Sequence, residues 1–99
     1  MNTDKMLNSR ERKLREFDGL TGLLHEARGK LKAYRHVLDR INAAREKGTD
    51  LDLGDLHDEV AARRIEVIQE GSQIAKELER LAPGITRRLL DGRSWDNLD

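Results

Sequence analysis

Apolar residues recur along the first half of the chain with the spacing of a helix that packs along one side. From Phe17 onward they fall in two heptad registers, which are Phe17, Leu24, Leu31 and Leu38, and Leu20, Ala27, Tyr34 and Ile41. A repeat of seven residues returns a side chain to the same face of a helix. The pattern predicts one long amphipathic helix, which we place at residues 8–47. Asn8 and Glu11 form a plausible capping pair at its start, and Gly48 suits the position just after its end.

A second apolar stripe follows a short polar connection and predicts a helix at residues 53–82. Its apolar positions are Leu56, Val60, Val67, Ile68, Ile74, Leu78 and Leu81. Asp52 or Asp55 is expected to open this helix, because acidic side chains stabilise a helix N-terminus. Pro83 should end it, since proline cannot donate the next ladder hydrogen bond and disfavours helix at the preceding residue. The broad apolar face can contact more than one neighbour.

The C-terminal part of the sequence predicts a short helix at residues 85–91 and a tail at residues 93–99. Ser94 followed by Trp95 and Asp96 has the character of an N-cap and a first helical turn. A helix start signal so close to the end of the sequence suggests a shortened chain.

The amino-acid composition indicates that these helices enclose a thin hydrophobic core. The 99 residues are 36% hydrophobic and 38% charged, so one domain spanning residues 1–99 is expected. The absence of cysteine excludes disulfides, thiolate metal ligands and a cysteine nucleophile. No apolar run approaches the length of about 20 residues that a membrane span needs, and we expect a cytoplasmic protein with no membrane partner.

The two halves of the chain carry opposite charge. Residues 1–48 hold 12 basic and 7 acidic groups, a balance of +5, and residues 49–99 hold 7 basic and 12 acidic groups, a balance of −5. An antiparallel hairpin would place these halves side by side, with weak attraction at the rims. Net neutrality argues against a nucleic-acid binder, which more often shows an overall positive excess.

The segment from Ala61 to Asp99 resembles HEPN-domain proteins of the HepT type, the toxin halves of toxin–antitoxin pairs with a minimal nucleotidyltransferase. Residues 63–70, RRIEVIQE, are similar to the run of a basic residue, an apolar one, Glu, two aliphatics, Gly and Glu in the family's second helix. Pro83, Ile85 and Trp95 resemble its proline-containing turn and the Trp that opens its last main helix. The resemblance implies a helical fold, dimerisation and a nucleotidyltransferase partner.

The chain also departs from this family at specific places. The family's ribonuclease motif is an Arg, a short polar spacer and a His, usually followed by a Tyr, on the helix near the Trp. The sequence ends at Asp99 before such a motif appears. Gln69 stands where the family usually has Gly, and Gly71 stands where it usually has Ala. The resemblance therefore implies the scaffold without the nuclease activity.

The remaining candidate chemistry is sparse. His25 and Glu26 begin a metalloprotease-like pattern, but position 29 is Gly where a second His would be needed. His36 and His57 lie near carboxylates on polar helix faces, where solvated surface is the usual role. We therefore assign no catalytic residue, no metal and no cofactor.

Five arginines are the contact candidates: Arg63, Arg64, Arg87, Arg88 and Arg93. Arg64 falls within the second apolar stripe, where a buried guanidinium needs a carboxylate partner. Two roles stay open for the set, namely ion pairs with a neighbouring helix or subunit, which we favour, and contacts with RNA phosphate.

The sequence thus predicts an all-α antiparallel helical hairpin with a short C-terminal helix, completed as a dimeric helical bundle. The packing stripe comprises Phe17, Leu20, Leu24, Leu31, Tyr34, Leu38, Ile41, Val60, Val67, Ile74, Leu78 and Leu81. The function expected is a noncatalytic HEPN-like interaction module that works by homodimerisation and protein binding. The alternatives are a free-standing helical adaptor or inhibitor, for example one of phage origin, and an RNA-binding protein or ribonuclease.

Overall fold

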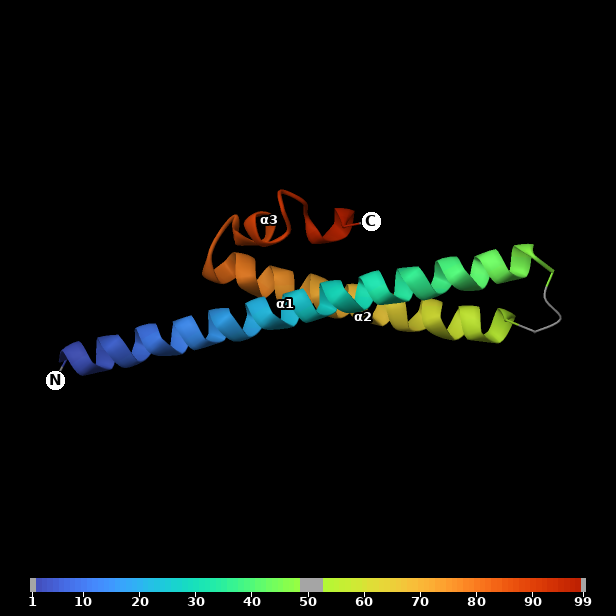
Figure 1. The fold of residues 1–99 in the computed structure, drawn as a ribbon. Coiled ribbons are helices and arrows are strands. Elements are labelled where there is room, and N and C mark those ends of the chain that lie inside the picture. Colours follow the sequence, from blue (N-terminus) through green and yellow to red (C-terminus); the bar gives the residue numbers. More distant parts are fainter. Residues whose placement is uncertain (1, 49–52, 99) are drawn as a thin grey trace.

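The chain folds into two long antiparallel helices with a short C-terminal segment laid across one of them (Figure 1). The computed structural model describes residues 2–48 and 53–98, with side chains described from residue 9 onward. Helix α1 spans Asn2–Glu46 and helix α2 spans Gly54–Leu81. The short helix α3 spans Ile85–Leu89, and the 3-10 turn η1 spans Trp95–Asn97. The predicted all-α hairpin with a short C-terminal helix is confirmed.

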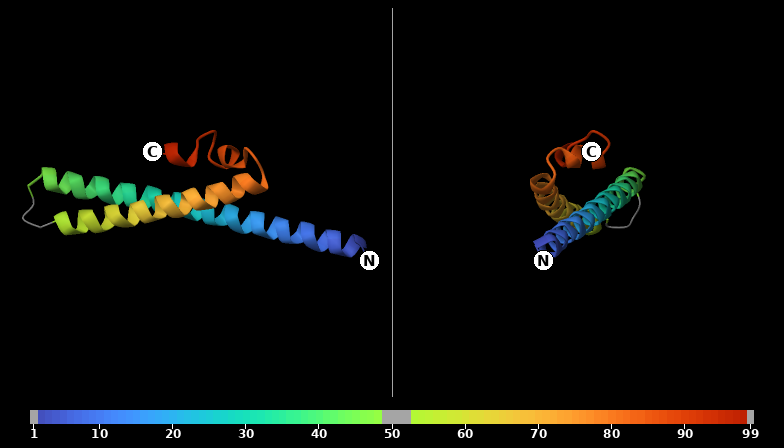
Figure 2. Two further views of the ribbon diagram at one scale, coloured as in Figure 1. Left: turned by 180° about the vertical axis from the view of Figure 1, so that it is seen from behind. Right: turned by 90° about the vertical axis from the view of Figure 1, so that its left-hand side faces the viewer.

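The molecule is a rod rather than a compact globule (Figure 2). Its principal extents are 71 × 23 × 14 Å, and its Cα radius of gyration is 18.8 Å. A compact domain of this length would have a radius of gyration of about 13 Å. The two views in Figure 2 show that α1 and α2 cross at a shallow angle and that the N-terminal part of α1 continues past the end of α2. One hairpin therefore covers only part of its own longest helix.

The core is a line of side chains between the two long helices, extended by side chains of the C-terminal segment. Its fully enclosed members are Leu24, Leu78 and Leu90, and Ala27, Leu31, Ile41, Val67 and Ala75 are also buried. Every residue of the predicted packing stripe is buried or half-buried in the structure. The heptad spacing places these side chains on the facing sides of α1 and α2, so the stripe becomes the hairpin interface.

Three predicted boundaries need correction. Helix α1 begins at Asn2, so Asn8 lies inside it and is not its N-cap. No proline interrupts residues 2–8, and extending an existing helix adds one hydrogen bond per residue fixed. The α2 N-cap is Leu53, without a side-chain capping bond; Asp55 lies in the first turn, and Asp52 lies outside the described residues. Helix α3 ends at Leu89, because Asp91 adopts a φ of 57° that no helix can continue.

The C-terminal segment turns back over α2 after Pro83. Ala82 is extended, and Gly84 has a φ of 85°, which glycine adopts without steric cost. The chain then runs through α3 and η1 along the side of α2, as Figure 1 shows in orange and red. Within the described residues, no helix is long and apolar enough to cross a membrane.

Candidate functional site

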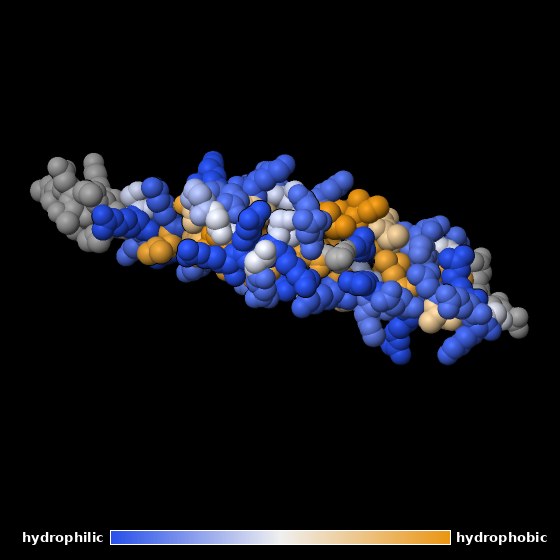
Figure 3. Space-filling view, turned by 90° about the horizontal axis from the view of Figure 1, so that it is seen from above, coloured by the Kyte–Doolittle hydropathy of each residue, from blue (hydrophilic) through white to orange (hydrophobic). Residues whose placement is uncertain are grey.

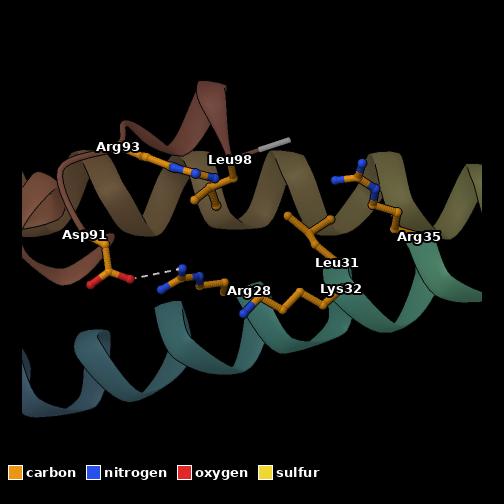
Figure 4. A pocket seen from close by; sticks show the side chains of 7 residues that line it. All are labelled: Arg28, Leu31, Lys32, Arg35, Asp91, Arg93 and Leu98. Atoms are coloured by element: carbon orange, nitrogen blue, oxygen red, sulfur yellow. Dashed lines mark hydrogen bonds and ion pairs between the residues drawn. The ribbon is translucent and has the colours of Figure 1, made fainter.

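A pocket of about 360 Å³ lies between α1 and the C-terminal segment (Figure 4). Its lining residues are Arg28, Leu31, Lys32, Arg35, Asp91, Arg93 and Leu98. Helix α1 supplies the first four of these, and the turn after α3 and the end of the chain supply the rest. Figure 4 shows Arg93 on the opposite side of the pocket from Arg28 and Lys32, with Leu31 and Leu98 between them. The described lining is strongly cationic, with Asp91 as its only carboxylate.

The turn that carries Asp91 into this pocket is fixed by the backbone. Asp91 and Gly92 both have positive φ, at 57° and 84°. The Gly92 amide donates to the Arg87 carbonyl at 2.6 Å, and the Arg93 amide donates to the Leu90 carbonyl at 3.1 Å. Leu90, just before the turn, is completely enclosed. The Arg28 guanidinium Nη2 reaches Asp91 Oδ2 at 3.3 Å, and this ion pair ties α1 to the C-terminal segment.

Trp95 fastens the same segment to α2. Its indole Nε1 donates to the Ile68 carbonyl at 2.8 Å, and its side chain is 6% exposed. The ring lies directly on Gly71, where an added Cβ would overlap the indole atoms. The glycine at this position, which departs from the resembled family, therefore provides the space that the tryptophan occupies.

Glu79 near the end of α2 holds the start of α3. Its carboxylate accepts from the Gly84 amide at 2.6 Å, from the Thr86 amide at 3.3 Å and from the Thr86 hydroxyl. Gly84 is the N-cap residue of α3 and Thr86 lies in its first turn, where backbone donors have no helical acceptor. The Thr86 hydroxyl, and after it the Gly84 amide, lower the pKa of Glu79 below its ordinary value of 4.5, because both donate to the charged form. Glu79 thus acts as a remote cap on α3.

A second, apolar groove lies at the place where α1 passes the end of α2. It is lined by Arg10, Lys13, Leu14, Phe17 and Leu81 and measures about 360 Å³. Leu14 is 62% exposed, whereas Phe17 and Leu81 are half-buried. Beside it, Arg80 Nη2 of α2 approaches Glu16 Oε1 of α1 at 4.0 Å. The groove has an apolar floor with two cations at its rim.

The five predicted arginines do not form one site. Arg63 is exposed and pairs with Glu59 at 3.2 Å within α2, and Arg64 is half-buried. Arg87 and Arg88 are exposed on α3. Only Arg93 of this set lines the cationic pocket. The structure therefore separates residues that the sequence analysis had grouped.

The histidines and Tyr34 show no catalytic arrangement in the part of the chain that the structure describes. His25 and His36 are exposed, and His57 Nδ1 lies 3.3 Å from Asp58 Oδ1 of the next residue. Tyr34 is half-buried and packs against the core. Among the described residues, no group of three or more His, Asp or Glu side chains could hold a metal ion.

Sequence reasoning missed Arg28, Lys32 and Asp91, which form most of the cationic pocket with Arg93. Arg28 and Asp91 are 63 positions apart, and only the return of the chain over α2 brings them together. One local signal was present, since an Asp-Gly pair such as Asp91–Gly92 is typical of a tight turn.

Comparison with known proteins supplies no further guide to the site. No protein-family model, curated protein or solved structure matches this chain.

Proposed function

We propose that this chain is a noncatalytic helical interaction module, which associates with a second copy of itself and, as that dimer, binds a protein partner. The observation that carries the proposal is the apolar groove at the end of α2, where α1 continues past α2. Leu14 is 62% exposed beside Phe17 and Leu81. Covering apolar surface of this kind stabilises a complex by about 25 cal/mol per Å² removed from water.

Charge complementarity supports a second copy as the occupant of this groove. Arg10 and Lys13 form its cationic rim. The outer face of α2 carries exposed Glu66 and Glu70, which are one helical turn apart, with Ile65 beside them at 55% exposure. Two copies related by a twofold axis would place the N-terminal part of each α1 on α2 of the other, so that each contact occurs twice.

Hydrophobic side chains elsewhere on the rod are more scattered. Figure 3 shows the face that bears the C-terminal segment. Its surface is largely hydrophilic, with separate hydrophobic patches along its length. Leu23 and Val37 of α1 and Leu56 of α2 are exposed to 50%, 38% and 45%. Isolated apolar residues are normal on protein surfaces, whereas the groove gathers three around one cavity.

Sedimentation analysis at micromolar concentration tests the self-association. We expect a dimer for the parent and a monomer for Leu14→Glu. Leu23→Glu is the control, because Leu23 is also an exposed leucine of α1, at 50%, and lies outside the groove. Reversal of charge by Arg10→Glu and Lys13→Glu should weaken the dimer, and the added changes Glu66→Lys and Glu70→Lys should restore it. A fully helical monomeric parent, or equal effects of Leu14→Glu and Leu23→Glu, would refute the dimer.

A relation to the HEPN-domain toxin–antitoxin proteins is part of the same proposal. It is supported by the turn at Pro83 after α2 and by Trp95, which begins η1 and packs against α2. The partner class that follows is a minimal nucleotidyltransferase. Co-expression of the chain with a minimal nucleotidyltransferase of this class should yield a stable complex; recovery of the two proteins as separate species would remove this part of the proposal.

A further inference from the structure

We propose that the pocket between α1 and the C-terminal segment is a binding site for a phosphomonoester group. Arg28, Lys32 and Arg35 line it from α1, and Arg93 lines it from the C-terminal segment. Asp91 is the one carboxylate among the described lining residues. Even without Arg35, three cations line the pocket, namely Arg28, Lys32 and Arg93. This inference rests on the pocket alone and is independent of the proposed dimer.

The cations of the pocket suit an anionic group. They line it from two separate elements, α1 and the C-terminal segment. Arginine fits phosphate oxygens with two parallel donors. The Arg28 side chain is only 24% exposed, and its ion pair with Asp91 orients the guanidinium at the pocket wall. A partly enclosed cation attracts an anion more strongly than a fully solvated one, because the surrounding dielectric is lower.

The size of the pocket and its apolar residues indicate what kind of group is attached to the phosphate. A volume of about 360 Å³ lies near the lower end of the range for small-molecule sites, which runs from about 300 to 1,000 Å³. Leu31 is buried and Leu98 is half-buried, and both lie between the charged walls. A small organic group attached to the phosphate could contact these leucines. The shared chemistry is a phosphomonoester, carried either by a free small molecule or by the 5′ end of an oligonucleotide.

A ligand that bridges α1 and the C-terminal segment would report through Trp95. This is the only tryptophan of the chain, and it lies four residues beyond Asp91. Its fluorescence reports on the environment of the segment that forms one wall of the pocket, and we expect it to change when a ligand binds there. Titration with inorganic phosphate and with phenyl phosphate should give a saturable signal, with heat of binding measured by calorimetry as an independent readout. The absence of saturable binding by both methods would overturn the proposal.

Charge-neutralising variants localise the site. Arg93→Gln and Lys32→Gln should each weaken phenyl phosphate binding about tenfold, which is the usual cost of losing one charge-assisted hydrogen bond. Arg88→Gln removes the same charge from exposed α3 outside the pocket and should leave the affinity within about twofold, since screened surface charges act weakly at a distance. Circular dichroism and thermal unfolding confirm that each variant is folded. Equal weakening by Arg88→Gln and Arg93→Gln would show general charge attraction and overturn the site.

Asp91→Asn supplies a test with the opposite sign. Asparagine accepts the positive φ of 57° at this position, so the turn is preserved. Removing the negative charge leaves Arg28 available to the ligand, and phosphate affinity should rise about threefold. Weaker binding by Asp91→Asn would contradict the proposed role of this pocket.

A final comparison separates the two sources of the phosphomonoester. Phenyl phosphate, a 5′-phosphorylated trinucleotide and the same trinucleotide with a 5′-hydroxyl are titrated in parallel. Tighter binding of phenyl phosphate assigns the site to free small molecules, and tighter binding of the 5′-phosphorylated trinucleotide assigns it to an oligonucleotide end. Equal binding of the two trinucleotides would show that the terminal phosphate is not recognised and would overturn the proposal.

Discussion

Contacts of a few individual residues hold the C-terminal segment against α2, and these contacts join residues that are not adjacent in the sequence. Gly71 leaves room for the Trp95 ring, and the Trp95 indole donates to the Ile68 carbonyl. Glu79 accepts from two amides and one hydroxyl at the start of α3. The Glu79 carboxylate accepts hydrogen bonds from amides that have no acceptor within α3. The Trp95 ring occupies the space that a side chain larger than Gly71 would fill.

Gly71→Ala should loosen the C-terminal segment although alanine is the better helix former. A Cβ at this position overlaps the Trp95 ring, so the indole must leave its place. We expect a red shift of tryptophan fluorescence and a lower melting temperature. Gly22→Ala is the matched control, because nothing lies within 4 Å of its Cβ position, and it should stabilise the protein by up to about 1 kcal/mol. A stabilised Gly71→Ala with unchanged fluorescence would contradict the observed packing.

Glu79 gives the stability of the chain a defined dependence on pH. Its folded-state pKa is lowered, so the charged carboxylate stabilises the fold above its ordinary pKa of 4.5, and this contribution is lost as the pH falls through the lower folded value. Urea unfolding should show the parent more stable than Glu79→Gln at pH 6, with the difference shrinking below pH 4.5. A difference that stays constant across this range would exclude a charge-dependent role.

At the scale of elements, the two long helices depend on each other because each has only one apolar stripe. Most buried core residues come from α1 and α2, and Leu90 and Trp95 of the C-terminal segment complete the core. A helix with a narrow stripe gains most of its stability from the partner that covers the stripe rather than from its own propensity. Damage to either stripe should therefore weaken the whole hairpin.

Leu31→Asp and Val67→Asp should each destabilise the hairpin by about 3 kcal/mol or more, because each would bury a charge without a partner. Both side chains are 6% exposed, one on each helix. The corresponding changes His25→Asp and His36→Asp affect exposed positions and should be nearly silent. Similar thermal shifts at all four positions would be incompatible with this assignment of the core.

At the scale of the whole molecule, the length of α1 decides the shape. Helix α1 has 45 residues and α2 has 28, so an antiparallel pair leaves part of α1 beyond the end of α2. The same difference in length creates the groove around Leu14. The extended shape and the uncovered groove are thus two consequences of one feature.

Small-angle X-ray scattering of the Leu14→Glu variant tests this shape directly. We expect a radius of gyration close to the 18.8 Å of the single hairpin, well above the value of about 13 Å for a compact domain of equal length. The parent should give a larger value when it is dimeric. A monomeric variant as compact as a globular domain would mean that α1 folds back on itself.

The sequence by itself determined the helical class, the hairpin and the residues of the packing stripe. These follow from local rules, because heptad spacing defines one face of a helix and Pro83 prevents α2 from continuing. Tertiary structure alone decided that Trp95 lies on Gly71, that Glu79 caps α3 and that Arg28 meets Asp91. These pairs are separated by 24, 7 and 63 positions, and their contact depends on the path of the backbone after Pro83 rather than on any periodic pattern. The cationic pocket belongs to this second group, because its walls come from opposite parts of the chain.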